Sequence, residues 1–418
     1  MVQFPEGPDT YADQAPPTLS VASGVTAVPL FLADFGPGFS AVTGPQEPAP
    51  TGTSGTDSDP RLSGLRASGL PGLGRLPVHA RALRGIAAGD VPGTVVISAF
   101  RDLGHTGTSG RPTLLQLILR HHFDAGGGYA YLGNTHGRTL KETLAESRAY
   151  PDIAILVPID LWTQGPGAAA EQAREVVAAA AGRGAMAVLH ADRRHDVEAA
   201  VRAFADLGLS PEQSRFAAAY HPWLSGPGPD TDPVPPVGAV TGTWSRTDRA
   251  GGVWKAPANA ALPVGLRPDR KVDDAQQTRA GSVNLIREFP GRGTVLRGAR
   301  TLDEGSDPTW RSVPVTRLLS MIRRDVETAL RPLLFEPDDE TSRRAVRSAV
   351  ENYLHHLFQQ GAFAGDSPKN AYFVRIGTGA TMTDADTPAG ILTFDIGVAP
   401  LRPDEFVTLE FTQQTATD

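Results

Sequence analysis

The chain has 418 residues, a net charge of −7 and no cysteine; 40% of its residues are hydrophobic and 20% are charged. This length is enough for two or three domains with sizeable cores. The lack of cysteine excludes disulfides, thiolate nucleophiles and cysteine-ligated zinc or iron–sulfur centres, and the negative net charge disfavours nucleic-acid binding.

The N-terminal part predicts an arm followed by strands. Four prolines within residues 1–18 forbid regular structure there. The stretch 18–35, "TLSVASGVTAVPLFLADF", is rich in residues that favour strands. The candidate strand residues are Leu19, Val21, Val25 and Val28. Segment 41–92 is polar and proline-rich at first and then weakly patterned, which predicts a flexible linker region.

No targeting segment is recognisable. The first residues carry neither the basic nor the apolar region of a secretory signal. No apolar run approaches the roughly 18 residues of a membrane span. We therefore expect a protein made and assembled in the cytoplasm, with no membrane span.

The middle of the chain alternates apolar strands with helices. The predicted strands are 93–100, 126–135, 151–159, 185–191 and 215–223, and the predicted helices are 113–123, 139–147, 167–184 and 195–208. Gly184 follows the alanine-rich third helix and predicts its end. Such alternation is typical of a mostly parallel sheet with helical crossovers.

After a linker at 227–236 the pattern changes to two long helices and three strands. The predicted helices are 315–335 and 339–363, and the predicted strands are 371–377, 389–400 and 404–414. The last strand carries one apolar side, and the side chains of interest on it are Phe406, Val407, Leu409 and Phe411. A terminal strand needs a sheet to join, either its own or a neighbour's.

Charge is distributed unevenly along the chain. Residues 1–60 hold seven acidic and no basic side chains, and the stretch after Arg375 holds seven acidic and one basic. The body between them is net positive. Acidic ends on a basic body are expected for subunits whose ends bind to neighbouring subunits. The alternative explanation is that the charge serves only to keep the protein soluble.

No catalytic, cofactor-binding or metal site is evident. Phosphate-binding and nucleophile-elbow motifs are absent from the sequence. His190, Asp192, His195 and Asp196 fit a strand-to-helix turn with an aspartate cap better than a metal site. The acidic run 338–340 likewise fits a helix N-terminus. We therefore expect a structural protein rather than an enzyme and no cofactor, with an α/β hydrolase or nucleotide-dependent transferase as the alternative.

Several motifs follow one another in a fixed order. Pro235-Pro236-Val237-Gly238 precedes Arg246-Thr247-Asp248 and "GVWKAPAN" at 252–259. Further motifs are "HHFDAGGGYAYL" (121–132), "AAAYHPWL" (217–224), "GSVNLIREFPGRGTVLRGARTL" (281–302), the stretch 335–365 and "IGVAPLRPDEFVTLEFTQQ" (396–414). Together they resemble the tail sheath proteins of contractile phages and phage-tail-like injection systems. In that family a strand follows the Pro-Pro-x-Gly turn.

The resemblance implies a mixed α/β fold: a C-terminal sheath domain completed by N-terminal strands, an inserted α/β domain, and extended arms at both ends. The expected parts are 1–40 (arm and strands), 41–92 (linker), 93–233 (α/β domain), 234–400 (sheath domain) and 401–418 (arm strand). It also implies stacked hexameric rings of identical subunits around an inner tube protein, with baseplate and cap components as further partners. A non-contractile tail or baseplate protein remains an alternative.

Roles for particular residues follow from the same resemblance. The strand residues named above at both ends would pair with neighbouring subunits. Arg343, Arg344 and Arg347 on the helix at 339–363 are the preferred contact with the tube, and Arg323 and Arg324 on the preceding helix are the other choice. In the stretch 251–259 we expect Trp254 to anchor a structural loop, Pro257 to fix its bend and Lys255 to be available to a neighbour. The remaining structural motif residues are Asn259 and Arg300, and Arg297 stands where the family often has Trp.

Overall fold

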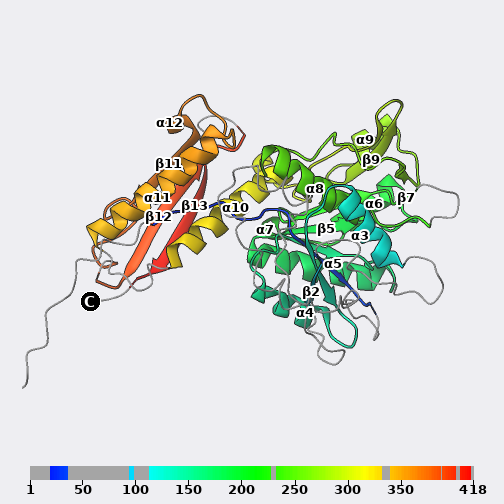
Figure 1. Cartoon of the computed structure of the whole chain (residues 1–418), viewed down its shortest axis with the longest axis horizontal. Coiled ribbons are helices and arrows are strands. Elements are labelled where there is room, and N and C mark those ends of the chain that lie inside the picture. Colours follow the sequence, from blue (N-terminus) through cyan, green and yellow to red (C-terminus); the bar gives the residue numbers. More distant parts are fainter. Residues whose placement is uncertain are drawn as a thin grey trace, which may run out of the picture. The chain divides into compact units, whose positions relative to one another are not determined.

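The computed structural model describes residues 19–35, 94–97, 113–226, 232–331, 339–386, 388–401 and 405–415. The chain forms two compact units, Val25–Arg317 and Met1–Gly24 with Leu318–Asp418. Figure 1 shows both. The arm expected over residues 1–18 and the linker expected at 41–92 lie outside the described residues. The five-part division drawn from the sequence separates parts by expected role and stays a prediction.

The larger unit contains two sheets and a set of short and medium helices. Its strands are β1 (Pro29–Ala33), β2 (Thr94–Ile97), β3 (Ala130–Asn134), β4 (Ile155–Pro158), β5 (Met186–His190), β6 (Ala217–His221), β7 (Leu224–Ser225), β8 (Arg267–Pro268), β9 (Asn284–Phe289) and β10 (Gly293–Leu296). Its helices are α3 (Leu114–Asp124), α4 (Leu140–Glu146), α5 (Pro166–Arg183), α6 (Val197–Ala205), α7 (Pro211–Ser214), α8 (Val237–Gly251) and α9 (Asp274–Arg279), with 3₁₀ turns at Ser147–Ala149 and Pro308–Arg311.

The main sheet has the strand order β10-β9-β6-β5-β4-β1-β3-β2. Strands β3, β1, β4, β5, β6 and β9 run parallel, and β2 and β10 are antiparallel at the two edges. The predicted mostly parallel sheet is therefore confirmed. It also recruits strands from outside the alternating stretch, because β1 precedes that stretch and β9 and β10 follow it.

Strand β1 is an interior strand of this sheet and lies between β3 and β4. Leu30 pairs with Tyr131 of β3 on one side and with Leu156 of β4 on the other. The strand predicted over 18–35 is thus confined to Pro29–Ala33, and residues 19–28 have no regular structure. Both edges of this strand are therefore paired within its own chain. It completes the α/β sheet and not the C-terminal sheet.

Helices cover both faces of the main sheet. Alternate residues of β1 enter two cores: Phe31 packs with α3 and α8, and Leu30 packs with α5 and α6. Alanines at helical spacing on α5 bring that helix close to the strands, and Gly184 ends it in the left-handed conformation (φ 67°), as the sequence predicts. The result is a three-layer α/β/α arrangement.

The smaller unit packs two helices with an antiparallel sheet. Its elements are α10 (Val313–Leu330), which begins in the larger unit, α11 (Glu340–Gln359), α12 (Pro368–Ala371), β11 (Tyr372–Ile376), β12 (Ile391–Val398) and β13 (Val407–Gln414). The strand order is β11-β12-β13, and Figure 1 shows α11 running alongside the strands. The predicted helices and strands of this region are confirmed.

Candidate functional site

The Arg-x-Asp motif supplies one half of a buried ion pair. Asp248 on α8 accepts two hydrogen bonds from the Arg317 guanidinium, at 3.0 and 2.5 Å. The side chains are 7% and 3% exposed. The guanidinium also lies 4.8 Å from the ring of Trp244, and its Nη2 donates to the Thr26 carbonyl at 3.0 Å. Asp248 therefore has a structural role at the centre of the larger unit.

Helix α8 replaces the strand that the resemblance implied after the Pro-Pro-x-Gly turn, and that expectation was wrong. Val237, Val240 and Trp244 recur at helical spacing and are fully buried. Two glycines let α8 approach α3. A Cβ at Gly238 would lie 2.0 Å from the Ile118 carbonyl oxygen, and one at Gly242 would lie 2.2 Å from the His122 oxygen. The resemblance placed Gly238 in a turn, whereas both glycines serve close helix packing.

The motif at 121–132 builds a glycine loop around a buried histidine. His122 Nδ1 lies 2.9 Å from Thr241 Oγ1, and Nε2 lies 3.1 Å from the Gly128 carbonyl. A Cβ on Gly127 would lie 2.1 Å from this ring, so only glycine fits. Burial lowers the pKa of His122 to about 4, so the ring is neutral near pH 7. The sequence placed this histidine in the motif at 121–132 and gave it no role of its own.

The loop at 251–259 fastens α8 to the edge of the main sheet. Val253 is its buried apolar residue at 2% exposure, while Trp254 is only half-buried and covers Gly252. The prediction of Trp254 as the core anchor therefore needs correction. Asn259 adopts a left-handed conformation (φ 55°), and its N–H donates to the Leu296 carbonyl at 2.7 Å.

The other residues of this loop lie in different surroundings. Arg297 donates to the Asn259 side chain. Pro257 is buried and Lys255 is exposed. A structural role for the loop fits these contacts, and a contact of Lys255 with a neighbour stays a prediction.

The motif at 281–302 closes on Asn284, which is 1% exposed. Its amide donates to the Ala219 and Arg300 carbonyls at 3.2 and 2.7 Å and accepts from the Arg300 N–H at 2.8 Å. Gly298 leaves room for this side chain, since a Cβ there would lie 2.3 Å from Asn284 Oδ1. The Arg300 guanidinium donates to the Gly281 carbonyl at 2.8 Å. These bonds hold the segment around Arg300, which follows β10, against β6 and β9.

The expected N-terminal contact residues lie in different surroundings. Val28 is 1% exposed and belongs to the core of the larger unit. Val25 is 47% exposed, and Leu19 and Val21 are half-buried. Val28 therefore has its packing partners within its own chain. A contact of Leu19, Val21 and Val25 with a neighbour stays a prediction.

The C-terminal strand joins its own chain. Strand β13 pairs with β12 over eight residue pairs, from Val398↔Val407 to Ile391↔Gln414. Phe411 stacks on Phe394 with ring centroids 4.9 Å apart, and Leu409 is buried beside it. Val407 is half-buried, and Phe406 meets Phe373 edge-on. Of the two sheets that a terminal strand can join, this strand joins its own in a single chain, and its pairing with a neighbour stays a prediction.

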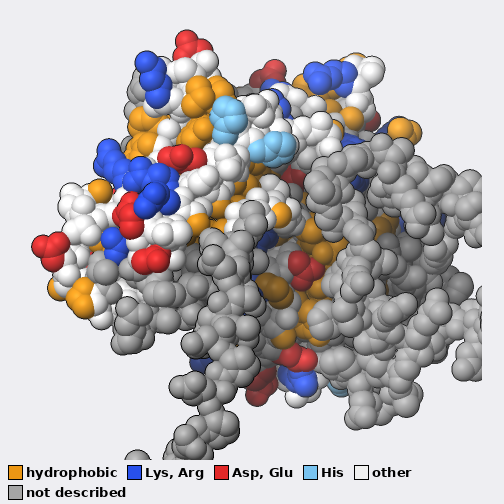
Figure 2. Space-filling view, turned by 60° about the vertical axis from the view of Figure 1, so that its left-hand side comes forward, with side chains coloured by type: hydrophobic (Ala, Val, Ile, Leu, Met, Phe, Trp, Pro, Cys, Tyr) orange, Lys and Arg blue, Asp and Glu red, His pale blue; other side chains and the backbone are white. Residues whose placement is uncertain are grey.

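Arginines from the two helices bind the outer strands of this sheet. Arg347 on α11 donates to the Ile376 carbonyl on β11 at 2.8 Å, and Arg323 on α10 donates to the Glu410 carbonyl on β13 at 3.3 Å. Arg347 therefore has a partner in its own chain. Arg344 is exposed and lies 3.4 Å from Glu340. Figure 2 shows basic side chains gathered beside acidic ones on one face of the molecule.

The acidic candidates act as helix caps. Asp196 accepts from the Ala199 N–H at the start of α6, and Asp339 accepts from the Ser342 N–H at the start of α11. Both capping interpretations are confirmed. Among the described residues, no three or more His, Cys, Asp or Glu side chains are grouped to hold a metal ion. Within the same residues, no helix has the length and apolar character needed to cross a membrane.

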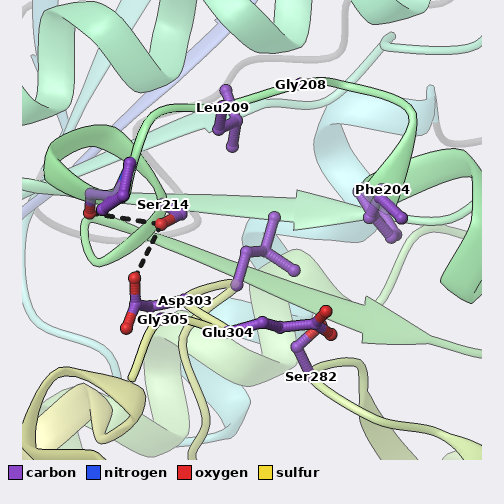
Figure 3. A pocket seen from close by; sticks show the side chains of 11 residues that line it. Phe204, Gly208, Leu209, Ser214, Ser282, Asp303, Glu304 and Gly305 are labelled. Atoms are coloured by element: carbon purple, nitrogen blue, oxygen red, sulfur yellow. Dashed lines mark hydrogen bonds between the residues drawn. The ribbon is translucent and has the colours of Figure 1, made fainter. Parts of the chain in front are cut away.

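A pocket of about 250 Å³ lies between α6, α7 and the segment around Asp303. Figure 3 shows Phe204, Leu209 and Ser282 among its walls. Ser214 donates to Asp303 at 3.0 Å. Asp303 is 5% exposed, and this buried bond connects α7 to the segment after β10. Ser282 likewise donates to Glu304 at 3.1 Å, and no histidine is among the residues that line this pocket.

Comparisons with known proteins agree on one family. The model of the phage tail sheath C-terminal domain matches residues 305–414. The tail sheath protein of Vibrio phage KVP40 (isolate Vibrio parahaemolyticus/Japan/Matsuzaki/1991) is 24% identical over 195 residues, which are 44% of this chain and 27% of that protein. The chain thus matches about a quarter of the length of that curated relative.

Solved structures match over nearly the whole chain. The sheath complex of the extracellular contractile injection system PVC, in the contracted state, is 30% identical with a TM-score of 0.70, and 99% of each chain is covered. The helical sheath of the anti-feeding prophage (AFP) in the contracted state is 28% identical with a TM-score of 0.67, covering 99% and 98%. A chain of the six-fold symmetrised AFP baseplate is 28% identical with a TM-score of 0.63, covering 98% and 99%.

This family consists of structural proteins, which decides against the alternative of an α/β enzyme. The full-length match to the PVC sheath also confirms the mixed α/β fold predicted from the sequence. The chain therefore belongs to the tail sheath protein family of contractile phage tails and phage-tail-like contractile injection systems, and it is a structural sheath subunit.

Proposed function

We propose that this subunit polymerises as stacked hexameric rings around an inner tube, and that contraction of the polymer drives the tube outward. The observation that carries the proposal is the match to the contracted PVC sheath over 99% of both chains. The match to a chain of a six-fold baseplate supports six subunits per ring. Baseplate and cap components would bind the two ends of the polymer.

The rings are held together by exchange of chain ends. Strand β13 is joined to β12 by residues 399–406, a connection of eight residues whose maximum span is about 26–29 Å. In the polymer, β13 of one copy takes the same place along β12 of a neighbour. The backbone bonds of such a strand persist while subunits move as rigid bodies.

The opposite edge of this sheet is suited to the N-terminal arm of another copy. The Ala399 N–H donates to the Ala371 carbonyl at 2.8 Å, so Ala371 faces β12. Because inward and outward pairs alternate in antiparallel sheets, Tyr372 and Val374 direct their backbone groups away from β12. Among the described residues no strand lies beyond β11. Residues 1–18 with Leu19 and Val21 would supply the added strand.

Contraction would release a metastable extended lattice. Each subunit needs to gain only a few kcal/mol in new contacts, because all subunits of the polymer change together. Helix α11 would face the tube through Arg343 and Arg344. The subunit would be assembled in the cytoplasm of the producing cell and act in a particle released from it, as the extracellular nature of the PVC system suggests.

A pair of cysteines tests the exchange of β13 directly. Thr393 and Thr412 are Cα partners with hydroxyls 3.5 Å apart, a geometry suited to a disulfide, and the chain has no other cysteine. Copies carrying Thr393→Cys are mixed with copies carrying Thr412→Cys, assembled with the tube and oxidised. We expect disulfide-linked dimers in the polymer, seen on non-reducing gels, and only monomers in unassembled mixtures.

The doubly substituted chain provides the complementary experiment. Oxidation before assembly ties β13 to its own β12 and should prevent polymerisation, while reduction should restore it. Deletion of residues 404–418 should likewise leave a folded body without striated cylinders in negative-stain micrographs. Cylinders formed by the oxidised double variant or by the truncated chain would contradict the exchange of β13.

A further inference from the structure

The connection before β1 is held by two buried carboxylates that are distant in sequence. Gly24 donates its backbone N–H to both oxygens of Asp325, at 3.2 and 3.3 Å. Two residues later, Thr26 Oγ1 donates to Asp248 Oδ2 at 2.5 Å. Neither residue belongs to a strand or helix. Side chains therefore fix this connection in place of sheet pairing.

Asp325 is built into the smaller unit as a fixed acceptor. It is 4% exposed, and Tyr353 on α11 donates to its Oδ2 at 2.8 Å. Burial raises the pKa of the Asp325 carboxyl, whereas the Arg324 guanidinium and the bonds from Tyr353 and Gly24 oppose this rise. A Cβ on Gly24 would lie 3.1 Å from Asp325 Oδ1, so the backbone approaches the carboxylate closely.

The hydroxyl and the backbone carbonyl of Thr26 are both bonded to side chains of the larger unit. Its hydroxyl donates to Asp248, and its carbonyl accepts from Arg317. Since Asp248 and Arg317 are themselves paired and buried, these contacts are anchored in a rigid core. The chain passes from one compact unit to the other between Gly24 and Val25, so each side of this passage has its own anchor.

We propose that Asp325 and Tyr353 are positioning residues that hold Gly24 on the smaller unit as the root of the N-terminal arm, and that Asp248 and Arg317 hold Thr26 on the larger unit. The arm then starts from the same point of the smaller unit in every subunit. This proposal rests on the proposed function, in which the N-terminal arm pairs with a neighbouring copy.

Two mild substitutions test it in the full-length chain. Tyr353→Phe removes one donor from Asp325, and Thr26→Val removes the hydroxyl bound to Asp248. Amide hydrogen exchange is measured by mass spectrometry on peptides covering 19–28 and on peptides from β4 and β5. We expect exchange in 19–28 to become about tenfold faster or more, as loss of a hydrogen bond to a charged group implies, with β4 and β5 unchanged.

Matched controls remove equivalent hydroxyls elsewhere. Thr247→Val deletes a bond to the Thr243 carbonyl on the same helix as Asp248, and Tyr129→Phe deletes a bond to the Asp152 carboxylate at 2.7 Å. Both controls should leave exchange in 19–28 as in the wild type. The test variants should also give fewer or shorter sheaths on tubes, and the controls should give normal ones.

Unchanged protection of 19–28 in both test variants would overturn the proposal, and so would a loss of protection shared equally with β4 and β5. A chain lacking residues 1–18 separates this failure from failure of the proposed function. If that deletion still forms normal sheaths, the exchange of the arm is wrong. If it forms none while Tyr353→Phe and Thr26→Val assemble and exchange like the wild type, only the positioning role is wrong.

Discussion

Arg317 and Asp248 form an ion pair in which both side chains are almost completely withdrawn from water, at 3% and 7% exposure. The pair joins the first turns of α10 to α8 and holds Thr26 through the Arg317 Nη2 and the Asp248 carboxylate. Trp244 covers one face of the guanidinium. Because this pair is buried, removal of one partner leaves the other charged group without compensation.

Replacement of the arginine in this pair should destabilise the chain strongly. We expect Arg317→Met to lower the free energy of unfolding by about 3–5 kcal/mol, the usual cost of breaking a buried pair. Urea unfolding followed by circular dichroism measures the loss. The matched control is Arg344→Met, since Arg344 and Glu340 form an exposed pair with side chains 71% and 69% exposed. That change should cost about 0–1 kcal/mol, and equal losses in the two variants would contradict the assignment.

The packing of α8 on α3 should be sensitive to a single methyl group. In Gly238→Ala and Gly242→Ala the added Cβ would meet the carbonyl oxygens of Ile118 and His122 at 2.0 and 2.2 Å. We expect each change to lower the thermal midpoint and to cost about 1–3 kcal/mol through overpacking.

A helical glycine with open space around it supplies the control for this prediction. A Cβ on Gly182 of α5 meets no atom within 4 Å, so Gly182→Ala should be neutral or should stabilise the helix by up to about 1 kcal/mol. If Gly242→Ala were as harmless as Gly182→Ala, the close approach of the two helices would be wrong.

Local patterns in the sequence were enough to predict most elements. Apolar runs predict β4, β5 and β6, helical spacing predicts α5 and α11, and Gly184 predicts the end of α5. The place of β1 was not predictable in this way, because its pairing with β3 and β4 depends on contacts with residues about 100 and 125 positions away. The strand expected in place of helix α8 came from the resemblance alone, because the packing role of Gly238 and Gly242 depends on their contact with α3, which is distant in sequence.

The anchoring residues were the hardest part to foresee. Gly24 and Asp325 are 301 residues apart, and no periodicity links them. The Arg-x-Asp motif did draw attention to Asp248, but its partner Arg317 lies in a helix that reads as ordinary and amphipathic. A signal was available for the helix pair, since Gly238 and Gly242 have the i, i+4 spacing that close helix contacts use.

Stability should fall as the solution becomes acidic, because buried histidines must stay neutral. The pKa of His122 drops from 6.5 in the unfolded chain to about 4 in the folded one because of burial, so the unfolded chain binds more protons between these values. Stability is complete above pH 6.5 and declines as the pH falls toward 4, with about 3 kcal/mol lost for this residue alone. Urea unfolding at pH 7, 5.5 and 4 measures the decline.

Substitution of this histidine should flatten the pH dependence. Gln in His122→Gln does not titrate and can still bond to Thr241 and Gly128, so the difference in unfolding free energy between pH 7 and pH 4 should shrink. His356→Gln is the control, because His356 is exposed on α11. A pH dependence that is the same in His122→Gln and in the wild type would contradict the role of this histidine.

Charge reversal on α11 tests the contact with the inner tube. Arg343→Glu with Arg344→Glu should leave the fold intact, because neither residue belongs to the buried face of the helix. It should abolish sheath assembly on purified tubes, since repulsion would replace attraction at the proposed interface. Circular dichroism, thermal unfolding and negative-stain microscopy distinguish the two effects. Lys141→Glu with Lys369→Glu changes the net charge by the same amount at two exposed positions outside α11 and should assemble normally. Normal sheaths from the arginine double variant would show that another surface faces the tube, with Arg323 and Arg324 on α10 as the next positions to reverse.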